Sequence, residues 1–164
     1  MRRLLFLFAG AALVLAVLAP VVASDGGRRF EASLNGYLET PSISTAGSGS
    51  FKLRIHEDSI DFTLNYRNLS VPPAVAHIHF GRPDVSGGVS VFLCGGAKPA
   101  CPASVSGTVT GTIVAADVGG PVLQGITAGE FAELVRAIRH GATYVNVHTS
   151  NFPNGEIRGN IRHD

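Results

Sequence analysis

Apolar and polar residues alternate with period two over several short stretches of the chain, which is the pattern of half-buried β-strands. Turn-forming residues such as Gly, Pro, Asn and Asp separate these stretches. The pattern predicts strands at about residues 29–38, 51–55, 60–66, 76–81, 89–94, 108–114, 144–149 and 156–161, with residues 39–50 as a loop. The pair at 51–55 and 60–66, joined by His56-Glu57-Asp58-Ser59, is the clearest hairpin.

One segment changes to helical spacing. Thr127-Ala128-Gly129-Glu130 fits a capping box, and apolar residues then recur at three- and four-residue intervals. Gly141 stands where a left-handed C-terminal cap is expected. The pattern predicts one short helix over about 127–140, packed on the sheet as a lid. Seven to eight strands with one helix predict an all-β fold, an antiparallel Greek-key sandwich or barrel.

Alternation also predicts where the histidines point. His77 and His79 share one face of a strand, about 7 Å apart, while the intervening Ile78 faces the other way. In the later strand Tyr144, Asn146 and His148 share a face. We therefore expect two strands that each present a polar, imidazole-bearing face.

The start of the chain has the features of a secretory signal. Two arginines precede an uncharged run from Leu4 to Ala23, and Val21-Val22-Ala23 ends in small residues at the −3 and −1 positions. We expect cleavage after Ala23, a flexible leader over 24–29 and one domain over 30–162, secreted or periplasmic and without a membrane span. The alternative is an uncleaved membrane anchor, because the run is long enough to span a bilayer.

Charge and motif content exclude some function classes. The chain has 13 Lys and Arg against 12 acidic residues, and loss of two arginines with the signal leaves a net charge near −1. There is no basic patch of the kind that binds nucleic acid. No phosphate-cradling glycine loop precedes a helix, and no spacing suggests a Ser-His-Asp triad.

The two cysteines, Cys94 and Cys101, enclose a Gly- and Pro-rich segment. In an exported chain such a pair is expected to form a disulfide that closes a small loop. A redox-active pair is the alternative, although the spacing is not Cys-x-x-Cys.

Three imidazoles on neighbouring strands, His77, His79 and His148, form a candidate metal site, because an open tris-histidine set suits copper or zinc better than calcium or magnesium. Convergence of their ring nitrogens to within about 4 Å would favour a metal. The first interpretation is a hydrogen-bonded polar network without a ligand, supported by Tyr144, Asn146, Glu156 and Arg158, and metal binding is the alternative to it. His56, His140 and His163 lie in a turn, at a helix end and in the tail, where solvated side chains are expected.

Several of these segments together resemble the CHRD domain, the repeat found in chordin. The resemblance spans about residues 30–162 and rests on Leu34-Asn35-Gly36, Glu39-Thr40-Pro41, Ala76-His77-Ile78-His79, Ile126-Thr127, 144–149 and Asn154-Gly155-Glu156-Ile157-Arg158-Gly159. It implies an extracellular binding or structural module without enzymatic activity, with a secreted or envelope protein as partner. Chordin itself is an extracellular antagonist of growth factors. We do not expect that activity of this chain, because the sequence lacks chordin's cysteine-rich modules.

A second resemblance, to Cu/Zn superoxide dismutase, is confined to the His-x-His strand and the later Val147-His148 strand. The metal-bridging histidine and the zinc loop of that family have no counterpart between Phe80 and Gly107. The resemblance therefore implies a copper-type or mononuclear site rather than dismutation. The alternative function is a periplasmic copper- or zinc-binding protein that uses His77, His79 and His148.

Overall fold

The computed structural model describes residues 28–164, so the predicted signal over 1–23 lies outside the described residues. The elements, in chain order, are β1 (Arg29–Asn35), η2 (Gly36–Leu38), β2 (Ser48–Ile55), β3 (Ser59–Arg67), β4 (Pro73–Phe80), β5 (Gly88–Cys94), β6 (Gly107–Val114), η3 (Ala115–Asp117), η4 (Val122–Gln124), α1 (Phe131–Arg139), β7 (Thr143–Thr149), β8 (Ile157–Asn160) and β9 (Arg162–His163). Within residues 28–164 no helix has the length and apolar character needed to cross a membrane.

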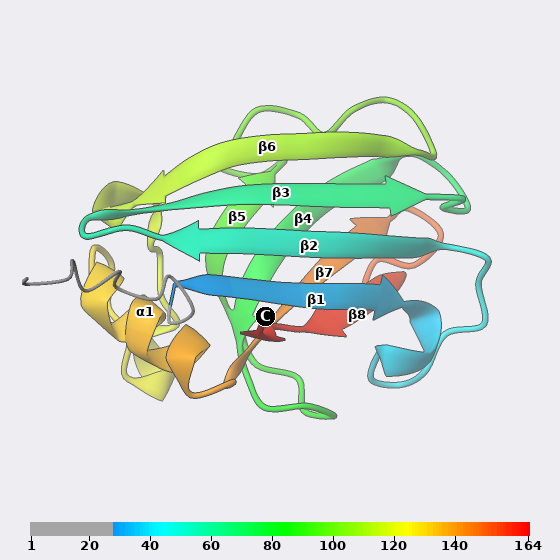
Figure 1. The fold of residues 1–164 in the computed structure, drawn as a ribbon. Helices are drawn as coiled ribbons and strands as arrows, with labels where there is room; N and C mark the ends of the chain where they lie inside the picture. Colours follow the sequence, from blue (N-terminus) through cyan, green and yellow to red (C-terminus); the bar gives the residue numbers. More distant parts are fainter. Residues whose placement is uncertain (1–27) are drawn as a thin grey trace, which may run out of the picture.

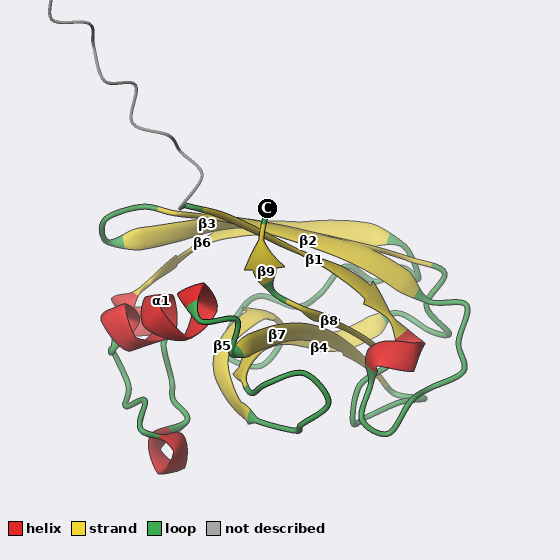
Figure 2. Cartoon of the chain, turned by 60° about the horizontal axis from the view of Figure 1, so that its bottom comes forward, coloured by secondary structure: helices red, strands yellow, loops and turns green. Residues whose placement is uncertain are grey.

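The strands pair antiparallel in the order β5-β4-β7-β8-β1-β2-β3-β6, and β9 pairs with β1. They form two layers, β1-β2-β3-β6 and β5-β4-β7-β8 (Figures 1 and 2), which meet where Asn35 of β1 pairs with Arg158 of β8. Consecutive strands β3 and β4 lie in different layers, and β3 pairs with β6 instead, which is a Greek-key connection. The predicted all-β class is confirmed, and the additional ninth strand is two residues long.

The core lies between the two layers, where the apolar side chains of the alternating strands meet. Inward residues such as Phe51, Ile60, Ile78 and Val145 are fully buried, and each such side chain contributes about 1.5–3 kcal/mol to folding. Helix α1 covers one end of this core (Figure 2), and its Leu134 and Ile138 are fully buried.

The helix is shorter than the 127–140 predicted, because it begins at Phe131. Gly129 has a φ of +84°, so its own backbone lies outside helical geometry and the helix can begin only after it. Half of the predicted capping box forms, since Glu130 Oε2 accepts the N–H of Thr127 at 2.6 Å. At the other end Gly141 is left-handed as predicted, and the N–H groups of Gly141 and Ala142 donate to the carbonyls of Ile138 and Ala137 in a Schellman motif.

The first strand also ends earlier than predicted. At Asn35 the side-chain oxygen accepts the N–H of Leu38, and the chain turns into η2 instead of continuing to residue 38. Gly36 is required at this turn, because a Cβ there would lie 2.3 Å from the carbonyl oxygen of Ile43. The turn carries Glu39 and Thr40 toward β8.

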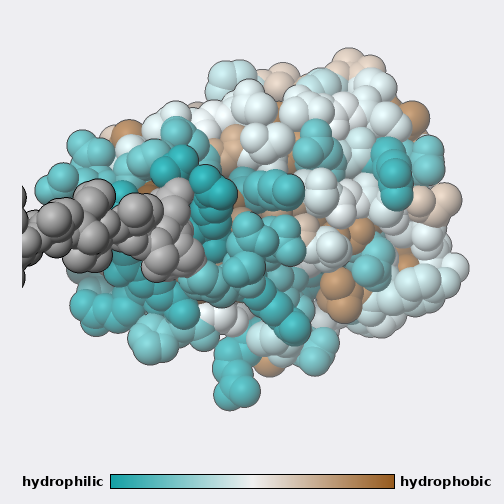
Figure 3. Space-filling model, viewed as in Figure 1, coloured by the Kyte–Doolittle hydropathy of each residue, from teal (hydrophilic) through white to brown (hydrophobic). Residues whose placement is uncertain are grey.

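The outer faces of the two layers differ. On β1-β2-β3 the outward residues, such as Glu31, Lys52 and Arg54, are exposed, and Figure 3 shows mostly hydrophilic and intermediate residues on this side. On β4, β7 and β8 the outward residues include His79 and Asn146, which are buried. The predicted disulfide between Cys94 and Cys101 is present, with a Cα–Cα distance of 4.9 Å, and ties the end of β5 to the loop before β6.

Glu156, just before β8, holds the loops at one end of the sandwich together. Its Oε1 accepts from Thr45 Oγ1 and the N–H of Ser70 at 2.7 and 2.8 Å, and its Oε2 accepts from the hydroxyls of Ser70 and Thr149 at 2.8 Å. Glu156 therefore does not join the network around the histidines that the sequence suggested for it, because this fully buried carboxylate accepts from hydroxyls and a backbone N–H of distant segments.

We expect Glu156→Gln to lower the free energy of unfolding by about 2–3 kcal/mol, because hydrogen bonds to a charged acceptor are lost and a buried amide donor faces other donors. Urea denaturation at pH 7 measures the effect. The control is Glu31→Gln on the exposed face, which should change stability by less than about 0.5 kcal/mol. Equal midpoints for the two variants would contradict the role of this carboxylate.

Candidate metal centre

The site is built on the outward face of the adjacent strands β4 and β7. In their register His77 lies opposite Asn146, His79 opposite Tyr144, and His148 opposite Val75. His148 therefore reaches His77 along a diagonal, within the range of long cross-strand side chains. On its other edge β4 shifts register against β5 immediately before each of His77 and His79, and such irregularities re-aim the side chains beside them.

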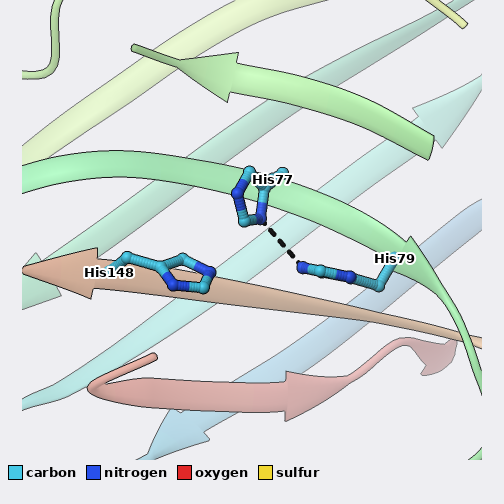
Figure 4. A group of neighbouring side chains, drawn as sticks. All are labelled: His77, His79 and His148. Atoms are coloured by element: carbon cyan, nitrogen blue, oxygen red, sulfur yellow. Dashed lines mark hydrogen bonds between the residues drawn. The ribbon is translucent and has the colours of Figure 1, made fainter. Parts of the chain in front are cut away.

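The three imidazoles converge as Figure 4 shows. Their ring centroids lie 4.7 Å apart for His77 and His79, 4.4 Å for His77 and His148, and 6.3 Å for His79 and His148. One ring nitrogen from each lies within 4.8 Å of the others. Within residues 28–164 this is the one group of three or more His, Cys, Asp or Glu side chains arranged in this way.

Backbone carbonyls fix the orientation of two of the rings. Nδ1 of His79 lies 2.9 Å from the carbonyl oxygen of Gly87, and Nδ1 of His148 lies 3.0 Å from that of Pro153. A carbonyl can only accept, so both rings donate from Nδ1 and keep a lone pair on Nε2. This is the arrangement typical of metal-ligating histidines, whose second nitrogen donates to a backbone oxygen or a carboxylate.

The nitrogens that face the common centre have fewer N–H protons than hydrogen-bond contacts. Nε2 of His79 lies 2.9 Å from Nδ1 of His77, which also lies 3.2 Å from Asn146 Oδ1. One proton on His77 Nδ1 serves both contacts. Asn146 Oδ1 is also 2.8 Å from Nε2 of His148, and in this orientation no proton stands between these two acceptors. A cation at this point would be attracted by every lone pair that faces it.

Burial keeps these rings neutral. Loss of solvent, together with the neighbouring His148 and His79, lowers the pKa of His77 to about 3. Loss of solvent likewise lowers the pKa of His79 to about 4, against a hydrogen bond to Gly87 that raises it. Burial also lowers the pKa of His148. At neutral pH all three rings are therefore neutral, as metal ligands must be, and each keeps one lone pair, which for His77 is on Nε2 while its proton is on Nδ1.

Two of the predicted supporting residues stack beside the centre. The Tyr144 ring is parallel to that of His79 at 4.6 Å, and the Arg158 guanidinium carbon lies 3.4 Å from the Tyr144 ring centroid. Arg158 Nη2 donates to the carbonyls of Arg82 and Val85, which holds the 81–87 loop over this face. The N–H of Gly87 in turn donates to the Tyr144 hydroxyl at 3.1 Å.

The sequence did not identify Glu39, which lies in the segment predicted as a loop. The structure buries it to 6% exposure, and this loss of solvent raises its pKa to about 7 against the attraction of Arg158 and hydrogen bonds from Asn146 and Thr40. Its place beside Asn146 connects it to the imidazoles. Only the Glu39-Thr40-Pro41 motif hinted that this segment matters.

The remaining histidines lie elsewhere, as predicted. His56, in the β2–β3 turn, hydrogen-bonds Asp61 of β3 at 3.0 Å, His140 is exposed at the end of α1, and His163 packs on Phe30.

The three ring nitrogens at the centre are separated by up to 4.8 Å, which exceeds the separation of about 4 Å that favours a metal. With ligand bonds of about 2 Å, side-chain movements of about 1 Å would bring the three nitrogens to one ion.

Comparison with known protein families identifies the domain. The family model of the CHRD domain matches residues 30–161, nearly the whole described part of the chain. The chain therefore belongs to the CHRD domain family, as its motifs suggested. Neither a curated protein nor a solved structure gives a significant match.

We expect the metal-free protein to lose stability as the pH falls from 6.5 toward 4. An unfolded histidine takes up a proton near pH 6.5, whereas the folded rings of His77 and His79 do so only near pH 3 and 4, so acid favours unfolding. Glu39 has the opposite effect on stability. Its carboxyl takes up a proton below about pH 7 in the folded protein but only near pH 4.5 when unfolded, so acid favours folding at this residue and cancels the effect of one imidazole.

Each uncompensated imidazole then contributes about 1.4 kcal/mol per pH unit. His77→Gln should reduce the slope of unfolding free energy against pH by about that amount between pH 6 and 4.5. Urea denaturation with a chelator present measures it, and His140→Gln is the control at an exposed site. An unchanged slope in the His77 variant would mean that this ring is not held neutral by the fold.

Proposed function

We propose that this CHRD domain is an exported binding module without enzymatic activity, and that the ligand its site fits best is one copper or zinc ion. The observation that carries the proposal is the convergence of His77, His79 and His148, two of which are anchored by Nδ1 so that Nε2 faces the common centre.

The donor set favours copper or zinc over harder ions. Three neutral imidazole nitrogens suit these two metals, and Cu²⁺ binds a given nitrogen site more tightly than Zn²⁺. Within residues 28–164 no second group of three or more His, Cys, Asp or Glu side chains converges in this way. This supports a mononuclear site rather than the paired metals of the dismutase that the His-x-His strand resembles.

Membership of the CHRD family and the disulfide support the exported-module part of the proposal. CHRD repeats occur in an extracellular protein, and disulfides persist in oxidising compartments. The uncharged run over residues 4–23 fits a cleaved signal.

A second candidate function is a metal-free structural or protein-binding module, with an extracellular or envelope protein as partner. The observation that favours it is the hydrogen-bond network itself, because each imidazole already has at least one polar partner in Asn146, a backbone carbonyl or a neighbouring ring. Such a network can have a purely structural role, in which it satisfies the buried polar groups of a covered sheet face without a metal.

Metal titration separates the two candidates. We expect the purified, EDTA-treated domain to bind one Cu²⁺ and, more weakly, one Zn²⁺ per chain, measured by competition with a chromophoric chelator. His79→Ala should weaken binding by more than about 100-fold, since loss of a ligand exceeds the loss of an outer partner. His140→Ala, at the exposed end of α1, should bind like the wild type.

Equal weakening in the two histidine variants would point to surface binding. Absence of any stoichiometric binding by the wild type would leave the metal-free module as the better account of the site. A protein partner would then be sought by pull-down from the native envelope or medium.

Export predicts a specific mature terminus. The protein recovered from the medium or envelope should begin at Ser24, 23 residues shorter than the translated chain, and intact-mass measurement determines this. Retention of the full-length chain in the membrane fraction would instead support the uncleaved anchor.

A further inference from the structure

Glu39 is a buried carboxyl group with an incomplete set of partners. It follows η2 and is 6% exposed, and its Oε1 has no hydrogen-bond donor within the described protein. The backbone of Gly155 closes over it, since a Cβ at that glycine would lie 2.4 Å from Oε1. Gly155 also has a φ of +126°, which disfavours any side chain there. The fold therefore keeps space for this carboxyl and little else.

Asn146 links this carboxyl to the metal centre. Its side-chain amide hydrogen-bonds the Glu39 carboxyl on one side, while its Oδ1 lies 3.2 Å from His77 Nδ1 and 2.8 Å from His148 Nε2 on the other. The negative end of the amide dipole thus faces the imidazoles and the positive end faces Glu39. An ionised carboxylate at that end polarises the amide further, and a cation among the imidazoles benefits from it.

The groups that face Glu39 leave its charge incompletely compensated. From β8 it faces Arg158, whose Nη2 donates to the carbonyls of Arg82 and Val85 and whose plane covers Tyr144. From β7 it faces the neutral Asn146, and from the turn before β8 the backbone of Gly155. The net result is the raised pKa of about 7, so near neutrality the carboxyl is poised between its two forms.

We propose that the carboxylate of Glu39 balances the charge of a divalent cation bound at the metal centre. The Glu39 carboxyl holds a proton when no metal is bound and releases it to solvent when the cation binds, and Asn146 couples the carboxyl to the imidazoles. This inference rests on the proposed metal binding and names a group outside the ligand set. The step needs no redox partner: the O–H bond of the carboxyl breaks, the proton leaves to buffer, and the carboxylate remains. Glu39 acts as a positioning and charge-balancing residue that does not touch the ion.

The pH dependence of zinc affinity tests the coupling. For the wild type we expect the affinity for Zn²⁺ to rise by up to about tenfold per pH unit below pH 7 and to level off above it, as one-proton linkage requires. His77 and His79 are already neutral over this range. Glu39→Gln should bind one ion more weakly at pH 8, with an affinity that is nearly flat between pH 5.5 and 8. Glu31→Gln, on the exposed face of β1, should follow the wild-type profile.

Proton release measured directly makes the test independent of any variant. Calorimetric titration of the wild type with Zn²⁺ at pH 6.5, in two buffers of different ionisation enthalpy, should show most of one proton released per ion, because a carboxyl with a pKa of about 7 is about three-quarters protonated at that pH. Glu39→Gln should release close to none.

The two proposals fail in different ways. If His79→Ala abolishes zinc binding but the wild type releases no proton and shares the Glu39→Gln profile, Glu39 is not the counter-charge and the metal site stands. If the wild type shows no histidine-dependent binding, the metal site itself is wrong, and this inference is overturned with it.

Discussion

The structure depends on satisfying polar groups on a sheet face that loops cover. Most antiparallel sheets of this kind leave one face to water, but here the outer face of β4, β7 and β8 lies beneath the 81–87 loop and the segment after η2. Every covered donor or acceptor then needs a partner inside the protein. Arg158 meets part of this need, because its Nη2 donates to two carbonyls of that loop. Glu156 has the corresponding role at one end of the sandwich, where it accepts from hydroxyls of distant segments.

The same requirement sets the chemistry of the histidines. Loss of solvent lowers their affinity for protons, and the carbonyls of Gly87 and Pro153 determine which nitrogen keeps its hydrogen. A covered polar face thus becomes a set of fixed lone pairs without any acidic ligand. The carboxyl of Glu39 stands behind Asn146, so its influence on the centre is electrostatic.

Period-two alternation was sufficient to predict the strands, the two faces of β4 and β7 and the candidate triad, because side-chain direction in a strand is a local property. It could not predict which loops return over a face, since those contacts join segments about 80–110 residues apart, such as Ser70 and Thr45 with Glu156. Glu39 was missed for that reason, and Glu156 was placed in the network around the histidines instead of among these loops. The helix start was misplaced because Gly129 adopts a left-handed conformation that the capping pattern does not reveal.

The sandwich has one seam without backbone pairing. Strands β5 and β6 are the two ends of the strand order, and they lie beside each other without forming a ladder. Exposed edge strands of a sheet are templates on which other chains can add strands, because their outer N–H and C=O groups are unpaired. The Cys94–Cys101 bond fastens the end of β5 to the connection that leads into β6. A covalent link therefore fixes the chain at one end of this seam, where no backbone ladder holds β5 to β6.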